Sequence, residues 1–207
     1  MEACVAVSIQ ADLHLHTTAS DGRLSPREMV DLTASRGLKV ISITDHDSTE
    51  GINEANKAAL DCPGLQVIAG IELSADVTNG EVHILGHFVD YESHALQSRL
   101  RVMRAGREGR AKGMVEKLKG IGIELEWQRV LSFSDGGAIG RPHIALAMVE
   151  KGYVTNTNEA FAKYLGRDGP AYVERERLTP EAAVALIRDF SGTATLALSL
   201  IHISEPT

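Results

Sequence analysis

The chain has 207 residues, of which 43% are hydrophobic and 24% charged, the mixture typical of a soluble protein with a hydrophobic core of its own. This composition excludes disorder, collagen and a coiled coil as descriptions of the whole chain. The formal net charge of −7 argues against a broad basic surface and a stable nucleic-acid complex, so a phosphate-bearing ligand would need local positive charge. Two distant cysteines, with neither a signal-like start nor a long apolar run, predict a cytoplasmic protein with no disulfide framework and no membrane segment.

Short β-like runs alternate with helical patterns at the start of the chain, which predicts an α/β fold with mostly parallel strands. Strands are expected at residues 5–16, 39–44, 65–71 and 81–88. A first helix should begin after Ser25, where Pro26 and Glu28 complete a capping box, and end at Gly37. A second helix is expected at residues 49–60.

Helical stretches rich in Arg and Lys replace this alternation further along, which indicates a helical insertion or cap. They are expected at residues 96–119, 142–151 and 158–165. A helix beginning at Thr179 and a strand at residues 192–198 then return to the first pattern. We therefore divide the chain into an N-terminal α/β part at 1–93, the insertion at 94–172 and the return at 173–197. Residues 198–207 resemble translated sequencing adapter, so we expect a non-native tail, with a short genuine strand as the alternative.

The strongest local signal is Asp12-Leu13-His14-Leu15-His16. Alternate residues of a strand share one face, so Asp12, His14 and His16 should lie together while Leu13 and Leu15 face the core. Two imidazoles on one strand can chelate a metal, and Asp12 would orient one of them from behind. The alternative is a pair of solvent-facing histidines on an edge strand.

Further metal-type ligands recur where other strands are expected to end. Asp21 lies in the Ser20-Asp21-Gly22 turn soon after the first strand, the Asp45-His46-Asp47 run ends the second, Glu72 ends the third, and His83 lies within the fourth. In α/β folds the carboxyl ends of the strands collect ligands and catalytic groups, so these side chains predict a metal site at one edge of the sheet. Imidazole and carboxylate ligands without thiolate favour Mn, Zn or Fe over a purely oxygen-bound Mg site.

Together these motifs resemble those of the PHP (polymerase and histidinol phosphatase) metallo-phosphoesterases. The resemblance rests on the DLHLH, SDG, TDHD, GIELS, VHILG and GRPH segments, the last at residues 140–143. It is closest to a branch of nucleoside 3',5'-bisphosphate phosphatases also described as RNase AM, and it covers about residues 8–197. It implies a distorted (β/α)7 barrel with a helical insertion and up to three divalent metal ions at the strand ends.

The resemblance also implies roles for individual residues. His14 and His16 would hold the first metal, Asp21 and His46 the second, and His83 and His143 the third, with Glu72 bridging two of them. The metals would activate water and neutralise phosphate oxygens, which gives hydrolysis of a phosphomonoester. The implied substrates are 3',5'-bisphosphates of nucleosides, with short RNA degraded from its 5' end as a further possibility.

Four more residues are candidates for catalysis or substrate binding. Asp45 is a candidate catalytic residue within the TDHD segment, and Arg141, beside His143, is a candidate for both roles because its planar guanidinium can hold a phosphate. Arg107 and Arg110 share one side of a helix with Arg104 and could face a second phosphate. A solvated helix face, or for Arg141 a surface position at a helix start, is the alternative.

The chain departs from the family's pattern after residue 197. Family members continue with a His-Pro pair and a later Asp-x-His element, whereas this chain has Leu198-Ser199 and then stops at residue 207. We therefore expect a C-terminally truncated and incomplete barrel that binds metal weakly and is nearly inactive. Two alternatives remain open: another PHP phosphatase, such as one resembling histidinol phosphatase, or an inactive metal-binding module.

Overall fold

The computed structural model describes residues 10–77, 80–134, 137–174 and 178–197. Five strands form one mixed sheet in the order β1-β2-β3-β4-β5. They are β1 (Ala11–Leu15), β2 (Val40–Ile43), β3 (Gln66–Val77), β4 (Gly80–His87) and β5 (Thr193–Leu196). The first three strands run parallel, and β4 and β5 are antiparallel to their neighbours. The α/β class is confirmed, but over the described ranges the sheet is open, with β1 and β5 at its edges, so barrel closure is not shown.

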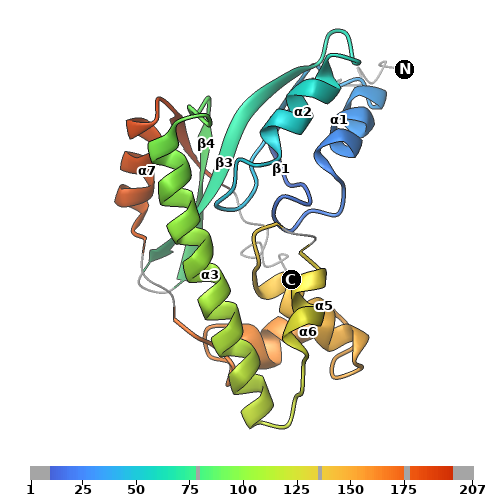
Figure 1. Ribbon diagram of the computed structural model, residues 1–207, viewed down its shortest axis with the longest axis vertical. Coiled ribbons are helices and arrows are strands. Elements are labelled where there is room, and N and C mark those ends of the chain that lie inside the picture. Colours follow the sequence, from blue (N-terminus) through green and yellow to red (C-terminus); the bar gives the residue numbers. More distant parts are fainter. Residues whose placement is uncertain (1–9, 78–79, 135–136, 175–177, 198–207) are drawn as a thin grey trace, which may run out of the picture.

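Helices pack on the sheet in two groups (Figure 1). Helices α1 (Pro26–Ser35) and α2 (Ile52–Ala59) cover β1 and β2, enclosing a core around Val30, Ile41 and Ile43. Helix α7 (Pro180–Asp189) and the first half of α3 (His94–Gly120) pack on β3 and β4. The predicted start of α1 is confirmed, because the Ser25 side chain accepts a hydrogen bond from the Glu28 backbone N–H and the Glu28 side chain caps the Ser25 N–H.

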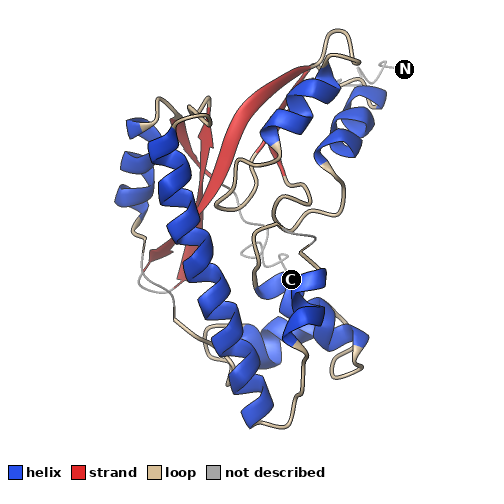
Figure 2. Cartoon of the chain, viewed as in Figure 1, coloured by secondary structure: helices blue, strands red, loops and turns tan. Residues whose placement is uncertain are grey.

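The segment predicted as an insertion is helical (Figure 2). It contains all of α3, then α4 (Trp127–Ser132), α5 (Arg141–Glu150), α6 (Thr157–Ala160) and a single π-helical turn at Phe161–Leu165. Helix α3 contributes to two separate cores: Leu96 and Leu100 pack with the sheet, whereas Met114 and Leu118 pack with the helices that follow. The long helix therefore joins the α/β part to the helical part.

Several element boundaries differ from those expected. Strand β3 runs six residues past Ile71, because it pairs with β4 as far as Val77. Residues 5–9 of the first expected strand, and Leu198 at the end of the last, lie outside the described residues. The expectation that Leu13 faces the core is wrong: Leu13 is 41% exposed, because β1 has a strand on only one side in the described sheet. Among the described helices, none combines the length and apolar character needed to cross a membrane.

Candidate metal centre

Glu72 lies at the centre of a cluster of four imidazoles. Its side chain is 1% exposed and comes from the middle of β3. Its Oε2 atom lies 3.2 Å from His14 Nε2, 2.8 Å from His16 Nε2 and 3.4 Å from His46 Nδ1. Its Oε1 atom lies 2.9 Å from His83 Nδ1. One carboxylate thus faces side chains from β1, from β4 and from the segments that follow β1 and β2.

A second carboxylate closes the other side of the cluster. Asp21 Oδ1 lies 3.3 Å from His16 Nδ1, and Asp21 Oδ2 lies 3.8 Å from His46 Nε2. The six side chains form three overlapping groups whose donor atoms each lie within 4.8 Å of one another. These groups are His14, His16 and Glu72; His16, Asp21 and His46; and His46, Glu72 and His83. The structure therefore brings together six of the seven side chains that the motifs predict as metal ligands.

The loop that carries Asp21 is held against the end of β1. The Gly22 N–H donates to the Thr17 carbonyl at 2.9 Å, and a Cβ atom at position 22 would lie 2.3 Å from the His16 carbonyl oxygen. Glycine is needed here because no side chain fits between the loop and the strand end. The SDG motif thus sets the distance between Asp21 and the two histidines that it faces.

The donor set fits divalent cations. His46 Nδ1 and Glu72 Oε1 are buried and lack a hydrogen-bond partner of acceptable geometry among the described residues, although His83 Nδ1 is near Glu72 Oε1. The Nε2 atoms of His14 and His16 lie 3.1 Å apart, both directed at the same carboxylate oxygen. Buried polar atoms are normally satisfied, and neutral imidazoles with carboxylates are preferred ligands of Zn, Mn and Fe.

In the absence of a cation, the imidazoles and carboxylates of the cluster shift one another's pKa values. Burial opposes the charged form of His16, but hydrogen bonds to Asp21 and Glu72 outweigh it and raise the pKa of His16 to about 10. Burial likewise opposes ionisation of Asp21 and Glu72, yet the facing histidines hold the pKa of each carboxyl far below its ordinary value. Burial lowers the pKa of His46 to about 4, so this ring is neutral at pH 7. His46 is therefore free of a proton that a metal would have to displace.

Asp45 lies behind the cluster and is almost fully buried. Its carboxylate accepts hydrogen bonds from the Thr17 N–H and Thr17 Oγ1, both at 2.7 Å, and from Ser20 Oγ at 2.6 Å. Burial raises the pKa of Asp45 above its ordinary value despite these bonds. Its contacts show that Asp45 ties the second strand end to the loop that presents Asp21.

Asp47, for which the sequence predicts no role beyond its place in the Asp45-His46-Asp47 run, makes the main contact between the cluster and helix α3. Its carboxylate pairs with Arg107 Nε, and Arg107 also donates to Ser74 Oγ at 3.0 Å. Asp47 has a positive φ of 49°, a conformation that Asp and Asn tolerate better than most residues. The second acidic residue of the Asp-His-Asp run was the sequence feature that could have predicted this salt bridge. A carboxylate that close to the end of a buried strand needs a cationic partner.

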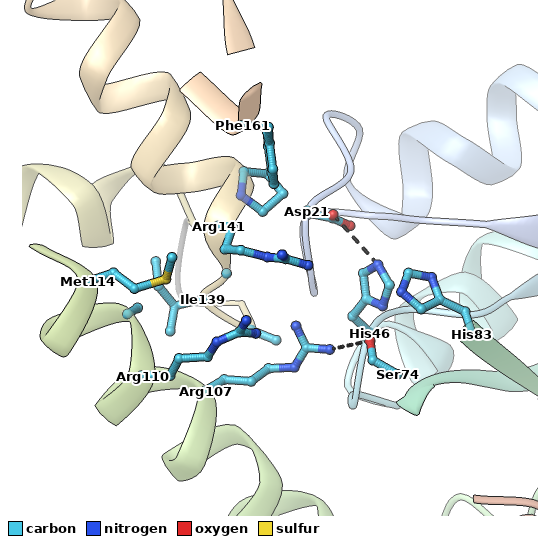
Figure 3. A pocket seen from close by; sticks show the side chains of 14 residues that line it. Asp21, His46, Ser74, His83, Arg107, Arg110, Met114, Ile139, Arg141 and Phe161 are labelled. Atoms are coloured by element: carbon cyan, nitrogen blue, oxygen red, sulfur yellow. Dashed lines mark hydrogen bonds and ion pairs between the residues drawn. The ribbon is translucent and has the colours of Figure 1, made fainter. Parts of the chain in front are cut away.

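A pocket opens from the cluster toward the helical part, and three arginines line it with Asp21, His46 and His83 (Figure 3). Arg107 and Arg110 come from α3 and Arg141 from the first turn of α5. Arg110 donates to the Val173 carbonyl at 2.8 Å, and the Arg141 guanidinium lies over the Phe161 ring. All three are partly buried, and Arg107 and Arg110 make contacts with residues outside α3.

Two predicted side chains lie elsewhere. His143 is buried, and its Nδ1 atom accepts a hydrogen bond from the Gly140 N–H at 3.0 Å; it belongs to none of the three donor groups found among the described residues. Burial lowers the pKa of His143 below its ordinary value. Asp12 accepts a hydrogen bond from the backbone N–H of His14 at 3.2 Å. The expectation that Asp12 orients a histidine ring is therefore not met, because its contact is with the strand backbone.

Comparison with known proteins places the chain in a family. The PHP domain model matches residues 12–157. A 3',5'-nucleoside bisphosphate phosphatase of Chromobacterium violaceum is 35% identical over 187 residues, covering 90% of this chain and 65% of that protein. A 5'-3' exoribonuclease of Haemophilus influenzae is 36% identical over 186 residues, covering 90% of this chain and 67% of that protein.

A solved structure agrees with the sequence comparisons. An amidohydrolase from Chromobacterium violaceum, with bound sulfate and no metal, superposes with a TM-score of 0.83 at 34% identity. The match covers 90% of this chain and 66% of that one. The family match, the curated relatives and this fold agree with the clustered histidines and carboxylates, and the chain belongs to the PHP domain family.

Proposed function

We propose that this chain is the larger part of a metal-dependent phosphatase that removes the 3'-phosphate of nucleoside 3',5'-bisphosphates. The observation that carries the proposal is the cluster of four imidazoles and two carboxylates opening onto a pocket flanked by three arginines. The cluster supplies the ligands for divalent cations, and the arginines supply the local positive charge that a bisphosphate needs in a protein of net charge −7.

Up to three ions of Mn, Zn or Fe would be held by the six clustered side chains, with His143 as a further ligand. When bound, they supply Lewis-acid stabilisation of the phosphate charge and an activated water. Glu72 is suited to bridge two ions because its two oxygens face different histidines. We assign Asp45 a positioning role, since its three hydrogen bonds hold the loop of Asp21.

The arginines bind and orient the substrate. Arg141 and Arg107 lie on the pocket wall with His46 and His83, and Arg110 lies one helical turn further along α3 from Arg107. A nucleotide whose 3'-phosphate reaches the cluster would place its 5'-phosphate among these guanidinium groups. We infer that they select substrates that carry a second phosphate, as a bisphosphate does.

One reaction accounts for the two activities named among the relatives. Water adds to phosphorus as the bond between phosphorus and the 3' oxygen breaks; the 3' oxygen takes one proton of the water, and the phosphate keeps the hydroxyl. With a bisphosphate, the products are a 5'-nucleotide and inorganic phosphate. With RNA, the same bond cleavage releases the first 5'-nucleotide and leaves a phosphate on the shortened chain. We therefore propose short 5'-phosphorylated RNA as a second substrate.

The chain spans about two thirds of the length of the curated relatives that it matches. We propose that residues 1–93 and 173–197 belong to a (β/α)7 barrel, that residues 94–172 form its insertion, and that residues 198–207 are not native to it. In the relatives the remaining third would complete the barrel and the metal ligands. A chimera of residues 1–197 followed by the matching C-terminal segment of the Chromobacterium violaceum relative, called the extended chain below, tests this.

The decisive experiment measures phosphate release from adenosine 3',5'-bisphosphate with added Mn²⁺. The extended chain should be active, the chain of 207 residues much less so, and His14→Ala and Glu72→Ala in the extended chain should abolish turnover. Arg36→Ala, at an exposed position at the end of α1, serves as the control and should change nothing. Equal turnover in the His14, Glu72 and unmodified proteins would refute the proposed chemistry.

A second candidate, an inactive metal-binding module, is favoured by the departures from the family's pattern at residues 198–199. It predicts that the chain of 207 residues binds Mn²⁺ without releasing phosphate. A phosphatase resembling histidinol phosphatase would instead release phosphate from a monophosphate as readily as from a bisphosphate. Comparing adenosine 3'-monophosphate with the 3',5'-bisphosphate distinguishes this second enzyme.

A further inference from the structure

A second hollow lies beside the catalytic pocket, between helices α3 and α7. It is lined on one side by Arg99, Val102, Met103 and Gly106 of α3 and on the other mainly by apolar residues of α7. The α7 side comprises Ala182, Ala185, Leu186 and Asp189, with Leu178 preceding that helix. The walls are accessible, since Val102 is 69% exposed. We call this hollow the α3–α7 groove.

The groove and the catalytic pocket meet at one boundary. Both are lined by Arg107 and Ser74, and Arg107 crosses from α3 to bond Ser74 and Asp47. The pocket extends from Arg107 along the following turns of α3, past Arg110 to Met114, and the groove extends along the preceding turns to Arg99. The two hollows therefore follow one helix in opposite directions from a shared guanidinium.

Helix α3 concentrates the positive charge of the chain. It contains eight Lys or Arg residues and two Glu residues, in a protein whose formal net charge is −7. The groove itself carries balanced charge: Arg107 pairs with Asp47, and Arg99 lies across the groove from α7, where Asp189 contributes the opposite charge. Such a surface suits a ligand that combines apolar faces with a few phosphates, because its aliphatic walls can bury base faces while the guanidinium groups of Arg99 and Arg107 can contact phosphates.

We propose that the α3–α7 groove holds the nucleotides of an RNA substrate that follow its first nucleotide. This inference rests on the proposed function, in which the first nucleotide occupies the catalytic pocket. In RNA the phosphate at the cluster is a phosphodiester, which carries a second nucleotide on its 5' oxygen; the 3'-phosphate of a bisphosphate does not. While the substrate is bound, this second nucleotide must occupy a space next to the cluster. The groove is that space, with the shared guanidinium of Arg107 at its entrance and Arg99 at its far end.

The dimensions agree with a short RNA segment. Arg99 and Arg107 are eight residues apart on one helix, which corresponds to about 12 Å along the axis, close to about three stacked nucleotides of 3.4 Å each. The walls between them are Val102, Met103 and Leu186, which can contact base faces. Arg99 can then contact a phosphate downstream of the cleaved bond.

The test compares two substrates in the extended chain with Mn²⁺: adenosine 3',5'-bisphosphate and a 5'-phosphorylated pentaribonucleotide. Arg99→Glu should lower kcat/KM for the RNA by about fivefold to tenfold, mainly through KM, and leave bisphosphate hydrolysis unchanged. Asp189→Asn should change RNA hydrolysis in the opposite direction. Arg101→Glu is the matched control, because Arg101 is an exposed arginine of the same helix that does not line the groove.

Two further measurements separate a contact with RNA from a structural effect. Arg99→Ala should reduce the slope of log kcat/KM for RNA against log salt concentration by about 0.7, the value for one phosphate contact on a single strand. Ala185→Trp, which fills the groove from an exposed position on α7, should lower kcat/KM for the pentanucleotide and leave kcat/KM for the bisphosphate unchanged. Arg188→Trp, at an exposed position of α7 outside the groove lining, is its control.

The outcomes distinguish this inference from the proposed function. If the unmodified extended chain hydrolyses neither substrate, the proposed function is wrong. If it hydrolyses both, and the Arg99, Asp189 and Ala185 variants have the same kcat/KM for RNA as the unmodified protein, the groove assignment alone is overturned. Equal losses on both substrates would also overturn it, since they would show that the groove residues support the catalytic pocket.

Discussion

The contact between Asp47 and Arg107 gives a stability prediction that depends directly on burial. The two side chains are 4% and 17% exposed, and Arg107 holds Ser74 as well as the carboxylate. Arg107→Ala leaves a buried carboxylate without its cation, which should cost about 3–5 kcal/mol of unfolding free energy. Asp47→Asn removes the charge and tolerates the positive φ at this position, so it should cost only about 1–2 kcal/mol.

The double variant makes the reasoning quantitative. Without a charge on residue 47, the loss of Arg107 costs little more than its hydrogen bonds, so the two changes should differ from additivity by about 2 kcal/mol or more. Urea denaturation of the metal-free chain in EDTA at pH 7, followed by circular dichroism, measures all four proteins. Arg101→Ala, at an exposed position of the same helix, should change stability by less than about 0.5 kcal/mol. Additivity within about 0.5 kcal/mol would refute the reasoning, because the pair would then contribute nothing as a pair.

Three other predictions concern the cluster. Metal affinity should rise with pH between about 6.5 and 10, because a bound cation displaces the proton of His16, whose pKa is raised to about 10. Titration calorimetry in buffers of different ionisation enthalpy should show that about one proton is released per site. If no proton is released, the assignment of a proton to His16 is wrong. In the metal-free protein the stabilising effect of that proton is fully present below pH 6.5 and lost as pH approaches 10, so His16→Gln should flatten the decline of Tm across this range. Gly22→Ala should lower Tm and weaken Mn²⁺ binding, since the added Cβ would collide with the His16 carbonyl. The control Gly109→Ala, in open space on α3, should raise Tm slightly. If Gly22→Ala changes neither Tm nor Mn²⁺ binding, the loop does not set the position of Asp21.

Much of the cluster could be predicted from the sequence, because its residues lie within or directly after expected strands, although Glu72 proved to lie in the middle of β3 and not at its end. His14 and His16 share one face of a short strand, and His46, Glu72 and His83 lie on neighbouring strands or directly after them. The parallel pairing of β1, β2 and β3 and the antiparallel pairing of β3 with β4 then bring these positions together. Local signals also sufficed for the start of α1, where the capping box is complete within four residues.

Other features depend on contacts that no local pattern reveals. The salt bridge of Arg107 to Asp47 joins positions 60 residues apart, so the arginine triplet on α3 did not identify its partner. The exposure of Leu13 follows from the edge position of β1, which a strand pattern cannot express. The extension of β3 to Val77 depends on antiparallel pairing with β4, and pairing is decided by the partner strand as much as by the strand itself.

Helix α3 has a mechanical consequence beyond its charge. With 27 residues it is about 40 Å long, and its two ends are anchored in different cores while Arg107 sits near its midpoint. Because α3 is anchored in both cores, a change in the angle between the helical part and the sheet would move its guanidinium groups relative to the histidines. Substitutions far from the histidines, at Met114 or Leu118, are therefore expected to alter the proposed phosphate contacts while every candidate metal ligand stays in place.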